Sequence, residues 1–321
     1  MASLKETKGR IASVKSTLKI TSAMKMVASA KLHKAQNAIE SMLPYERKLR
    51  EMLQLLLASV QAETRQALPP ENRATLGNVR GGDPSSLGGG PAEQDVFRGE
   101  MHAGKGCIVA IVALASNSSL CGGFNANVIR EVKARIAELK AEGCGVEVFS
   151  VGKKIADAMK KAGYPSEKDW NELVGHTSYS GADELARKLQ KAYEDGKYDR
   201  IELIYNHFVS TATQKVVRET YMPMAAPALE PGASRDWPED IIIEPTPYEM
   251  LADLMPLVRS LRIYTAILDS CAAEHAARTV AMQTATDNGE NILQELTLEY
   301  NKGRQQKITS EILDIVGGSM Q

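Results

Sequence analysis

Aromatic residues are scarce in this chain of 321 residues: they make up 5% of it, and the formal net charge is only −1. The scarcity of aromatics argues against a thick globular core, and the balanced charge provides no overall attraction to nucleic acid or to a membrane surface. No apolar run approaches the roughly eighteen residues that a membrane-spanning helix requires. We therefore expect no nucleic-acid partner, and membrane contact only through other proteins.

Metal-binding cysteine motifs are missing as well. The four cysteines are Cys107, Cys121, Cys144 and Cys271, without Cys-x-x-Cys spacing or paired histidines. This pattern argues against zinc and predicts buried free thiols in a reducing compartment. The basic, hydroxyl-rich N-terminus is similar to a transit peptide. We reject that interpretation because the helical pattern continues into residues 40–62 without a break.

The charge is unevenly distributed. Residues 1–39 contain one acid, Glu6, against eight bases: Lys5, Lys8, Arg10, Lys15, Lys19, Lys25, Lys31 and Lys34. Such a segment is typical either of a surface that meets an anionic partner or of an ordinary solvated helix face.

Two long helices are predicted at the ends of the chain. In residues 4–62, apolar side chains recur at three- and four-residue spacing, as at Ile11, Val14 and Leu18, which indicates a coiled-coil seam. Pro44 should kink or interrupt this helix. The last third, from Leu257 to Met320, lacks proline and would form a helix of about 90–100 Å. A helix of that length must pair with another long helix or lie inside a partner.

The middle of the chain alternates between strand and helix patterns. We expect buried strands at 107–114, 145–151 and 200–205, an edge strand at 215–222, and helices at 125–142, 153–162 and 182–194. The predicted fold class is therefore α/β: a long antiparallel two-helix coiled coil with an inserted Rossmann-like α/β domain of mainly parallel sheet. We place the N-terminal helix at 1–62, a Gly/Pro-rich connection at 63–105, the α/β domain at 106–244 and the C-terminal helix at 245–321.

The sequence contains motifs that partly match catalytic or ligand-binding loops, but the residues and elements around them do not support that chemistry. Gly99–Lys105 matches the spacing of a phosphate loop, but Gly106 replaces the Ser or Thr, and the motif precedes a strand. Leu120–Asn125 follows a strand and opens a helix, so it is either a tight turn capped by Asn125 or Asn127, or an anion cradle. No histidine is tied to Cys121 by spacing. We predict no catalytic site, cofactor or metal.

Two terminal stretches resemble the gamma subunit of F-type ATP synthases, of the bacterial type. They are 9–31, which includes Ile20-Thr21-Ser22-Ala23-Met24-Lys25, and 273–309, which includes Leu296-Thr297-Leu298-Glu299-Tyr300-Asn301. The turn Cys121–Asn125 also fits that family. Asn117-Ser118-Ser119 departs from it, because Asp-Arg-Gly is usual there. Gly289 and Gly303 stand where alanine is usual, and each should weaken the helix by about 1 kcal/mol.

The resemblance implies a central rotor stalk that is not itself catalytic. Such a stalk turns inside three alpha and three beta subunits, rests with an epsilon subunit on a ring of c subunits, and couples proton (ion) flow to ATP synthesis or hydrolysis. It implies a peripheral location at the cytoplasmic face of the bacterial inner membrane. The implied contacts with the alpha/beta head are Met24, Lys25, Arg278, Arg304, Gln305 and Thr309, and the implied apolar bearing tip comprises Ile308, Ile312, Leu313, Ile315 and Val316.

Two other classes of protein remain as alternatives. A coiled-coil scaffold or assembly protein would bind partners without any link to ATPase activity. A nucleotide-binding α/β enzyme would hold its ligand near Leu120–Asn127.

Overall fold

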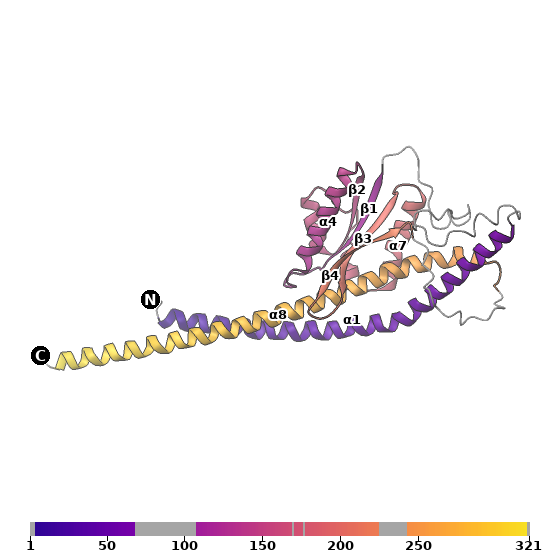
Figure 1. Ribbon diagram of the computed structural model, residues 1–321. Helices are drawn as coiled ribbons and strands as arrows, with labels where there is room; N and C mark the ends of the chain where they lie inside the picture. The colour runs from indigo at the N-terminus through magenta and orange to yellow at the C-terminus, as the bar shows by residue number, and fades with distance from the viewer. Residues whose placement is uncertain (1–3, 68–106, 169, 176, 225–242, 320–321) are drawn as a thin grey trace, which may run out of the picture.

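Two long helices dominate the computed structural model, which describes residues 4–67, 107–168, 170–175, 177–224 and 243–319. Helix α1 (Leu4–Ala67) has 64 residues and α8 (Pro247–Ser319) has 73. At 1.5 Å per residue they are about 95 and 110 Å long. They run antiparallel, with the α/β domain packed on one side of the pair (Figure 1). The predicted Gly77–Pro91 tract and Gly99–Lys105 motif lie outside the described residues.

One proline begins helix α8, and another lies inside helix α1 without interrupting it. Helix α8 begins at Pro247, and the Thr246 hydroxyl accepts a hydrogen bond from the Glu249 amide at 3.2 Å, as an N-cap does. Helix α1 is continuous through Pro44, so of the two outcomes predicted there, a kink or an interruption, the interruption does not occur. A proline inside a helix costs about 3 kcal/mol. Tertiary packing of the following turns offsets this cost, because Leu49 and Leu53 are buried.

The sheet has four strands in the order β2-β1-β3-β4. Strand β1 (Ile108–Leu114) pairs in parallel with β2 (Gly145–Val151) and with β3 (Arg200–Phe208), and β3 pairs antiparallel with the edge strand β4 (Gln214–Met222). Six of the seven residues of β1 are buried, because helices cover both faces of the sheet. The predicted mainly parallel sheet with an edge strand at its end is confirmed.

The two faces of the sheet are covered differently. Helices α4 (Phe124–Ala141) and α5 (Lys153–Lys161) cover one face. The other face packs against α7 (Tyr179–Glu194), the short α6 (Glu172–Gly175) and the middle of α8, whose Ile263 and Ile267 belong to the same apolar core. Helix α8 is therefore both a core helix of the α/β domain and one half of the coiled coil.

A buried ion pair joins α4 to the sheet. The Arg135 guanidinium donates to both carboxylate oxygens of Glu202 at 2.8 and 2.7 Å. Glu138 accepts from Arg135 and from Arg218 of β4, each at 2.9 Å. These contacts bind α4, β3 and β4 together, and Glu202 raises the pKa of Arg135.

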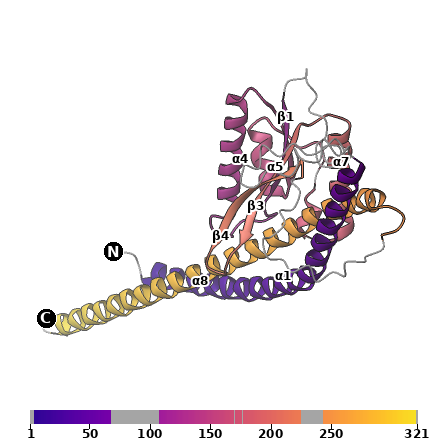
Figure 2. The same cartoon turned by 45° about the vertical axis from the view of Figure 1, so that its right-hand side comes forward.

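The far end of α1 turns towards α7 and the start of α8 (Figure 2). There Leu53, Leu56 and Leu57 pack against Leu251 and Met255. Helix α1 continues to Ala67, beyond residue 62, where the sequence led us to end it. Within the described ranges, no helix is both long and apolar enough to cross a membrane.

The cysteines differ from expectation. Cys107 and Cys144 form a disulfide between the residues that precede β1 and β2, whereas Cys121 and Cys271 are free and buried. The prediction of four free thiols is wrong for the first pair. Parallel pairing places Ile108 beside Gly145, which brings the two cysteines together. Burial raises the pKa of Cys271 to about 12.

Candidate functional site

The coiled-coil seam contains two glycines that accept leucines of the opposite helix. A Cβ atom at Gly289 would lie 2.7 Å from Cδ2 of Leu18, and one at Gly303 would lie 3.3 Å from Cδ2 of Leu4. On the same seam the Thr286 hydroxyl donates to the Thr21 hydroxyl at 2.9 Å. The two glycines therefore let α1 and α8 approach closely, and the expectation that they only weaken the helix needs correction.

The inward positions of α8 follow a strict alternation of four- and three-residue steps. They are Met282, Thr286, Gly289, Leu293, Leu296, Tyr300 and Gly303, each buried or half-buried, and from Thr286 onwards each stands between exposed neighbours. This is the heptad spacing of a left-handed coiled coil. Residues 304–319 extend beyond Leu4, the first described residue of α1, for about 24 Å as a single helix (Figure 1).

The small-residue run of α8 lies where three parts of the molecule meet. Ala272 and Ala276 are fully buried and pack against Leu32 of α1. Ala273, one position along, packs against Cys121 and Phe124 of the α/β domain. Side chains larger than alanine would separate these three parts, so the run keeps the shaft thin at its junction with the domain.

Five of the six predicted head contacts are distributed along the shaft and do not form one pocket. Met24 and Lys25 are half-buried on α1, whereas Arg304, Gln305 and Thr309 are exposed on the single-helix end of α8. From Thr286, which faces Thr21, to Arg304 the distance along the helix is about 27 Å. The Thr309 hydroxyl donates to its own helix, at the Gln305 carbonyl.

Arg278, the sixth predicted contact, lies inside the molecule. It is 9% exposed, pairs with the Glu274 carboxylate at 2.7 Å and donates to the Ser118 hydroxyl at 2.8 Å. Burial, together with the positive charges of Arg278 and Lys31, lowers the pKa of the neighbouring His275 to about 4. Little of the Arg278 side chain is left for another subunit.

The predicted bearing tip is open to solvent. The exposed fractions of Ile308, Ile312, Leu313, Ile315 and Val316 run from 46% to 72%. Five apolar side chains of this size do not remain exposed on one stable helix end without a covering surface, because each would gain about 1.5–3 kcal/mol from full burial.

The turn at Leu120–Asn125 is held by polar side chains. The amide of Ser116 donates to Oδ1 of Asn125 at 3.0 Å, and Nδ2 of Asn125 donates to the Ser118 carbonyl at 3.2 Å. Gly123 occupies the N-cap of α4 without a side-chain cap, so neither Asn125 nor Asn127 caps this helix as expected. The tight turn is the better interpretation, since its groups bond to one another.

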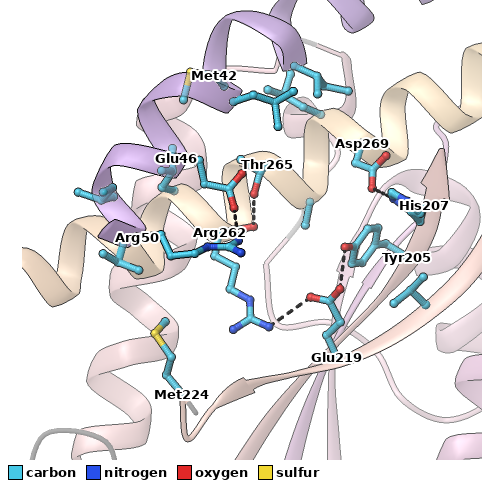
Figure 3. A pocket seen from close by; sticks show the side chains of 18 of the residues that line it. Met42, Glu46, Arg50, Tyr205, His207, Glu219, Met224, Arg262, Thr265 and Asp269 are labelled. Atoms are coloured by element: carbon cyan, nitrogen blue, oxygen red, sulfur yellow. Dashed lines mark hydrogen bonds and ion pairs between the residues drawn. The ribbon is translucent and has the colours of Figure 1, made fainter. Parts of the chain in front are cut away.

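A cavity of about 1000 Å³ lies between α1, α8 and strands β3 and β4 (Figure 3). Its walls are mainly apolar, and its polar groups pair with each other: Tyr205 and Arg262 both donate to Glu219, at 3.1 and 3.3 Å. Nδ1 of His207 lies 2.5 Å from Oδ2 of Asp269. No motif in the sequence pointed to this cavity, because it arises where two distant helices separate over the sheet.

The charged groups of this cavity form ion pairs, not a catalytic arrangement, and burial raises the pKa of Tyr205 above its usual range. In the part of the chain that the structure describes, no cluster of three metal-ligating side chains occurs.

Known proteins resemble the chain over its whole length. The sequence profile of a family described as ATP synthase matches residues 3–320. The ATP synthase gamma chain of Bacteroides thetaiotaomicron is 46% identical over 331 residues, with 100% of both chains covered. That of Flavobacterium johnsoniae is 40% identical over 319 residues, with 99% of this chain and 98% of the relative covered.

Solved structures share the fold at lower identity. A chain of the Euglena gracilis mitochondrial ATP synthase, OSCP/F1/c-ring, in rotational state 3, aligns with a TM-score of 0.56 at 19% identity, covering 99% of this chain and 93% of that one. A chain of the rotor of the same enzyme, in rotational state 1, aligns with a TM-score of 0.54 at 18% identity, covering 95% and 98%. At these identities the likeness concerns the fold.

Proposed function

The chain belongs to the family of ATP synthase gamma chains, and on that premise we propose how its shaft surface couples rotation to catalysis. It is the central stalk of an F-type ATP synthase and is not catalytic itself, since catalysis takes place on the beta subunits. Its partners are the alpha and beta subunits, an epsilon subunit and the ring of c subunits. ATP synthesis and proton transport follow from this membership.

The single-helix end of α8 is the observation that carries the proposal. Residues 304–319 extend beyond the described part of α1 and present apolar side chains on several faces. An apolar collar supplied by the alpha/beta head would cover them. The tip Ile308, Ile312, Leu313, Ile315 and Val316 then acts as a bearing, because it offers few hydrogen bonds that must break on each turn.

To couple rotation to catalysis, the shaft must present faces that interact differently with the partner subunits. A partner's conformational equilibrium shifts only by the difference between its interactions in the two states. Moving one site from 1:99 to 99:1 takes about 5.5 kcal/mol, whereas an exposed ion pair supplies about 1 kcal/mol or less. The coupling energy must therefore be spread over the shaft, as the separation of Met24 and Lys25 from Arg304, Gln305 and Thr309 allows.

The position in the cell follows in part from the family. The chain has a peripheral, membrane-associated position through its complex. We propose the cytoplasmic face of the bacterial inner membrane, because its curated relatives are bacterial.

Substitution of Arg304 tests the role of the exposed polar contacts. Arg304→Ala in the assembled complex should lower ATP turnover or the number of protons pumped per ATP, without loss of helix content. Lys307→Ala is the matched control, since Lys307 is an exposed base on the same helix end that pairs with Glu311. Wild-type turnover and pumping in Arg304→Ala would remove Arg304 from the contact set.

Titration of the isolated chain with ATP tests whether it acts enzymatically on its own. We expect no binding. A micromolar Kd for ATP would revive the enzyme interpretation.

A further inference from the structure

The loop between β1 and α4, residues 116–123, is anchored to the α/β domain on several sides. The Asn117 side chain donates to the Asn171 carbonyl at 2.8 Å and accepts from the Lys153 amide at 2.9 Å. Directly behind the loop, Nδ2 of Asn206 in β3 donates to the carbonyl of Phe124 at 3.2 Å. The loop is therefore a rigid part of the domain.

Within this loop, hydrogen bonds to the backbone carbonyl of Ser118 fix the orientation of this residue. That carbonyl accepts from the Ser116 hydroxyl at 2.6 Å and from Nδ2 of Asn125 at 3.2 Å. The Ser118 hydroxyl then faces α8 and accepts from Nη2 of Arg278 at 2.8 Å. Glu274 holds Arg278 from the other side at 2.7 Å, and both side chains of this ion pair are about nine-tenths buried.

We propose that Ser118 and Arg278 form a clasp that fixes the α/β domain to α8 and sets where the free shaft begins. Among the described residues, this is the side-chain hydrogen bond between domain and α8 that lies nearest the C-terminal end of the helix. The next one, from the Cys271 thiol to the Val174 carbonyl at 3.9 Å, lies seven positions earlier in α8. Arg278 is thus a positioning residue of the rotor, a role that its burial favours over direct contact with the head.

The mechanical consequence rests on the proposed function as a rotor stalk. Torque from the membrane ring enters the α/β domain and must pass into α8. If the clasp opens, the last side-chain hydrogen bond between the domain and α8 is that of Cys271, and the segment beyond it grows by about 10 Å. A longer free segment twists further under the same torque, so the angle of the shaft follows the domain less closely.

The clasp uses two neighbouring side chains of the loop. Asn117 anchors the loop to the domain, and Ser118 accepts the hydrogen bond from Arg278.

Ser118→Ala in the complete complex tests the clasp with a probe bead attached to the α/β domain. During the pauses between ATP-driven steps, we expect a wider distribution of bead angles than in the wild type. Amide hydrogens of residues 118–123 should exchange about tenfold faster, because a hydrogen bond to a charged group is lost. Ser118→Thr keeps the hydroxyl and should restore both values.

Ser260→Ala is the matched control. The Ser260 hydroxyl donates to Asp183 of α7 at 2.7 Å, so this variant also loses one hydroxyl bond between the domain and α8, but far from the free shaft. We expect its angular distribution to match the wild type. The proposal is overturned if Ser118→Ala leaves the distribution unchanged, or if Ser260→Ala widens it equally. Rotation by the wild-type complex tests the proposed function separately.

Discussion

Alanine substitutions at the two seam glycines should have opposite effects on the stability of the coiled coil. Replacing glycine by alanine inside a helix gains about 1 kcal/mol from backbone entropy. At Gly303 the new Cβ would lie 3.3 Å from Cδ2 and 3.9 Å from Cγ of Leu4, so only the end of that side chain must shift and most of this gain should remain. At Gly289 it would lie 2.7 Å from Cδ2 and 3.3 Å from Cγ of Leu18, and both atoms must move.

Overpacking of this kind costs about 1–3 kcal/mol, so we expect Gly289→Ala to lower the free energy of local opening by about 1 kcal/mol net. Native-state hydrogen exchange of the amides of residues 282–303 measures this free energy. Leu18→Ala in the Gly289→Ala background should remove the clash, and a double-mutant cycle isolates that coupling. If Gly289→Ala stabilises the coiled coil as much as Gly303→Ala does, close packing of Leu18 does not require a glycine at position 289.

Three further predictions concern the α/β domain and its junction with the shaft. Arg135→Met removes the bidentate partner of the buried Glu202 and should lower the free energy of unfolding by about 3–5 kcal/mol. The double variant Arg135→Met, Glu202→Leu should recover most of this loss. Denaturant titrations that follow the near-ultraviolet circular dichroism of the domain measure both values. The pKa of His275 lies at about 4 in the fold against 6.5 when unfolded, so the unfolded chain binds more protons between these values. Stability should therefore fall as the pH drops from about 6.5 to about 4, and His275→Asn should flatten that pH dependence if burial of this ring is its source. Alkylation of the unfolded chain without reductant should modify only the free Cys121 and Cys271, and mass spectrometry that finds four modified thiols would contradict the disulfide.

Periodicity alone was enough to predict the architecture. The three- and four-residue spacing at Ile11, Val14 and Leu18 indicated the seam, and the apolar run at 107–114 indicated a buried strand. Such patterns depend on each segment's own sequence. The sharing of α8 between the coiled coil and the core of the domain could not be predicted in this way, because it depends on which distant segment covers the sheet.

The functional surface was only partly predictable for the same reason. Arg304 and the apolar tip are exposed, and their contacts with the head stay predictions. The burial of Arg278 depends on a loop 160 positions away in the chain. The role of Gly289 depends on the register of two helices that are far apart in sequence, and the disulfide depends on the pairing of two strands. Local patterns contain none of this information.

The heptad spacing in α8 gives the helix pair a handedness, and handedness makes its mechanics depend on direction. Torque of one sense tightens a left-handed supercoil of two helices, and torque of the other sense loosens it. We expect winding to press Leu18 closer to Gly289 and unwinding to move it away. Synthesis and hydrolysis turn the stalk in opposite senses, so we expect this shaft to be stiffer in one working direction than in the other.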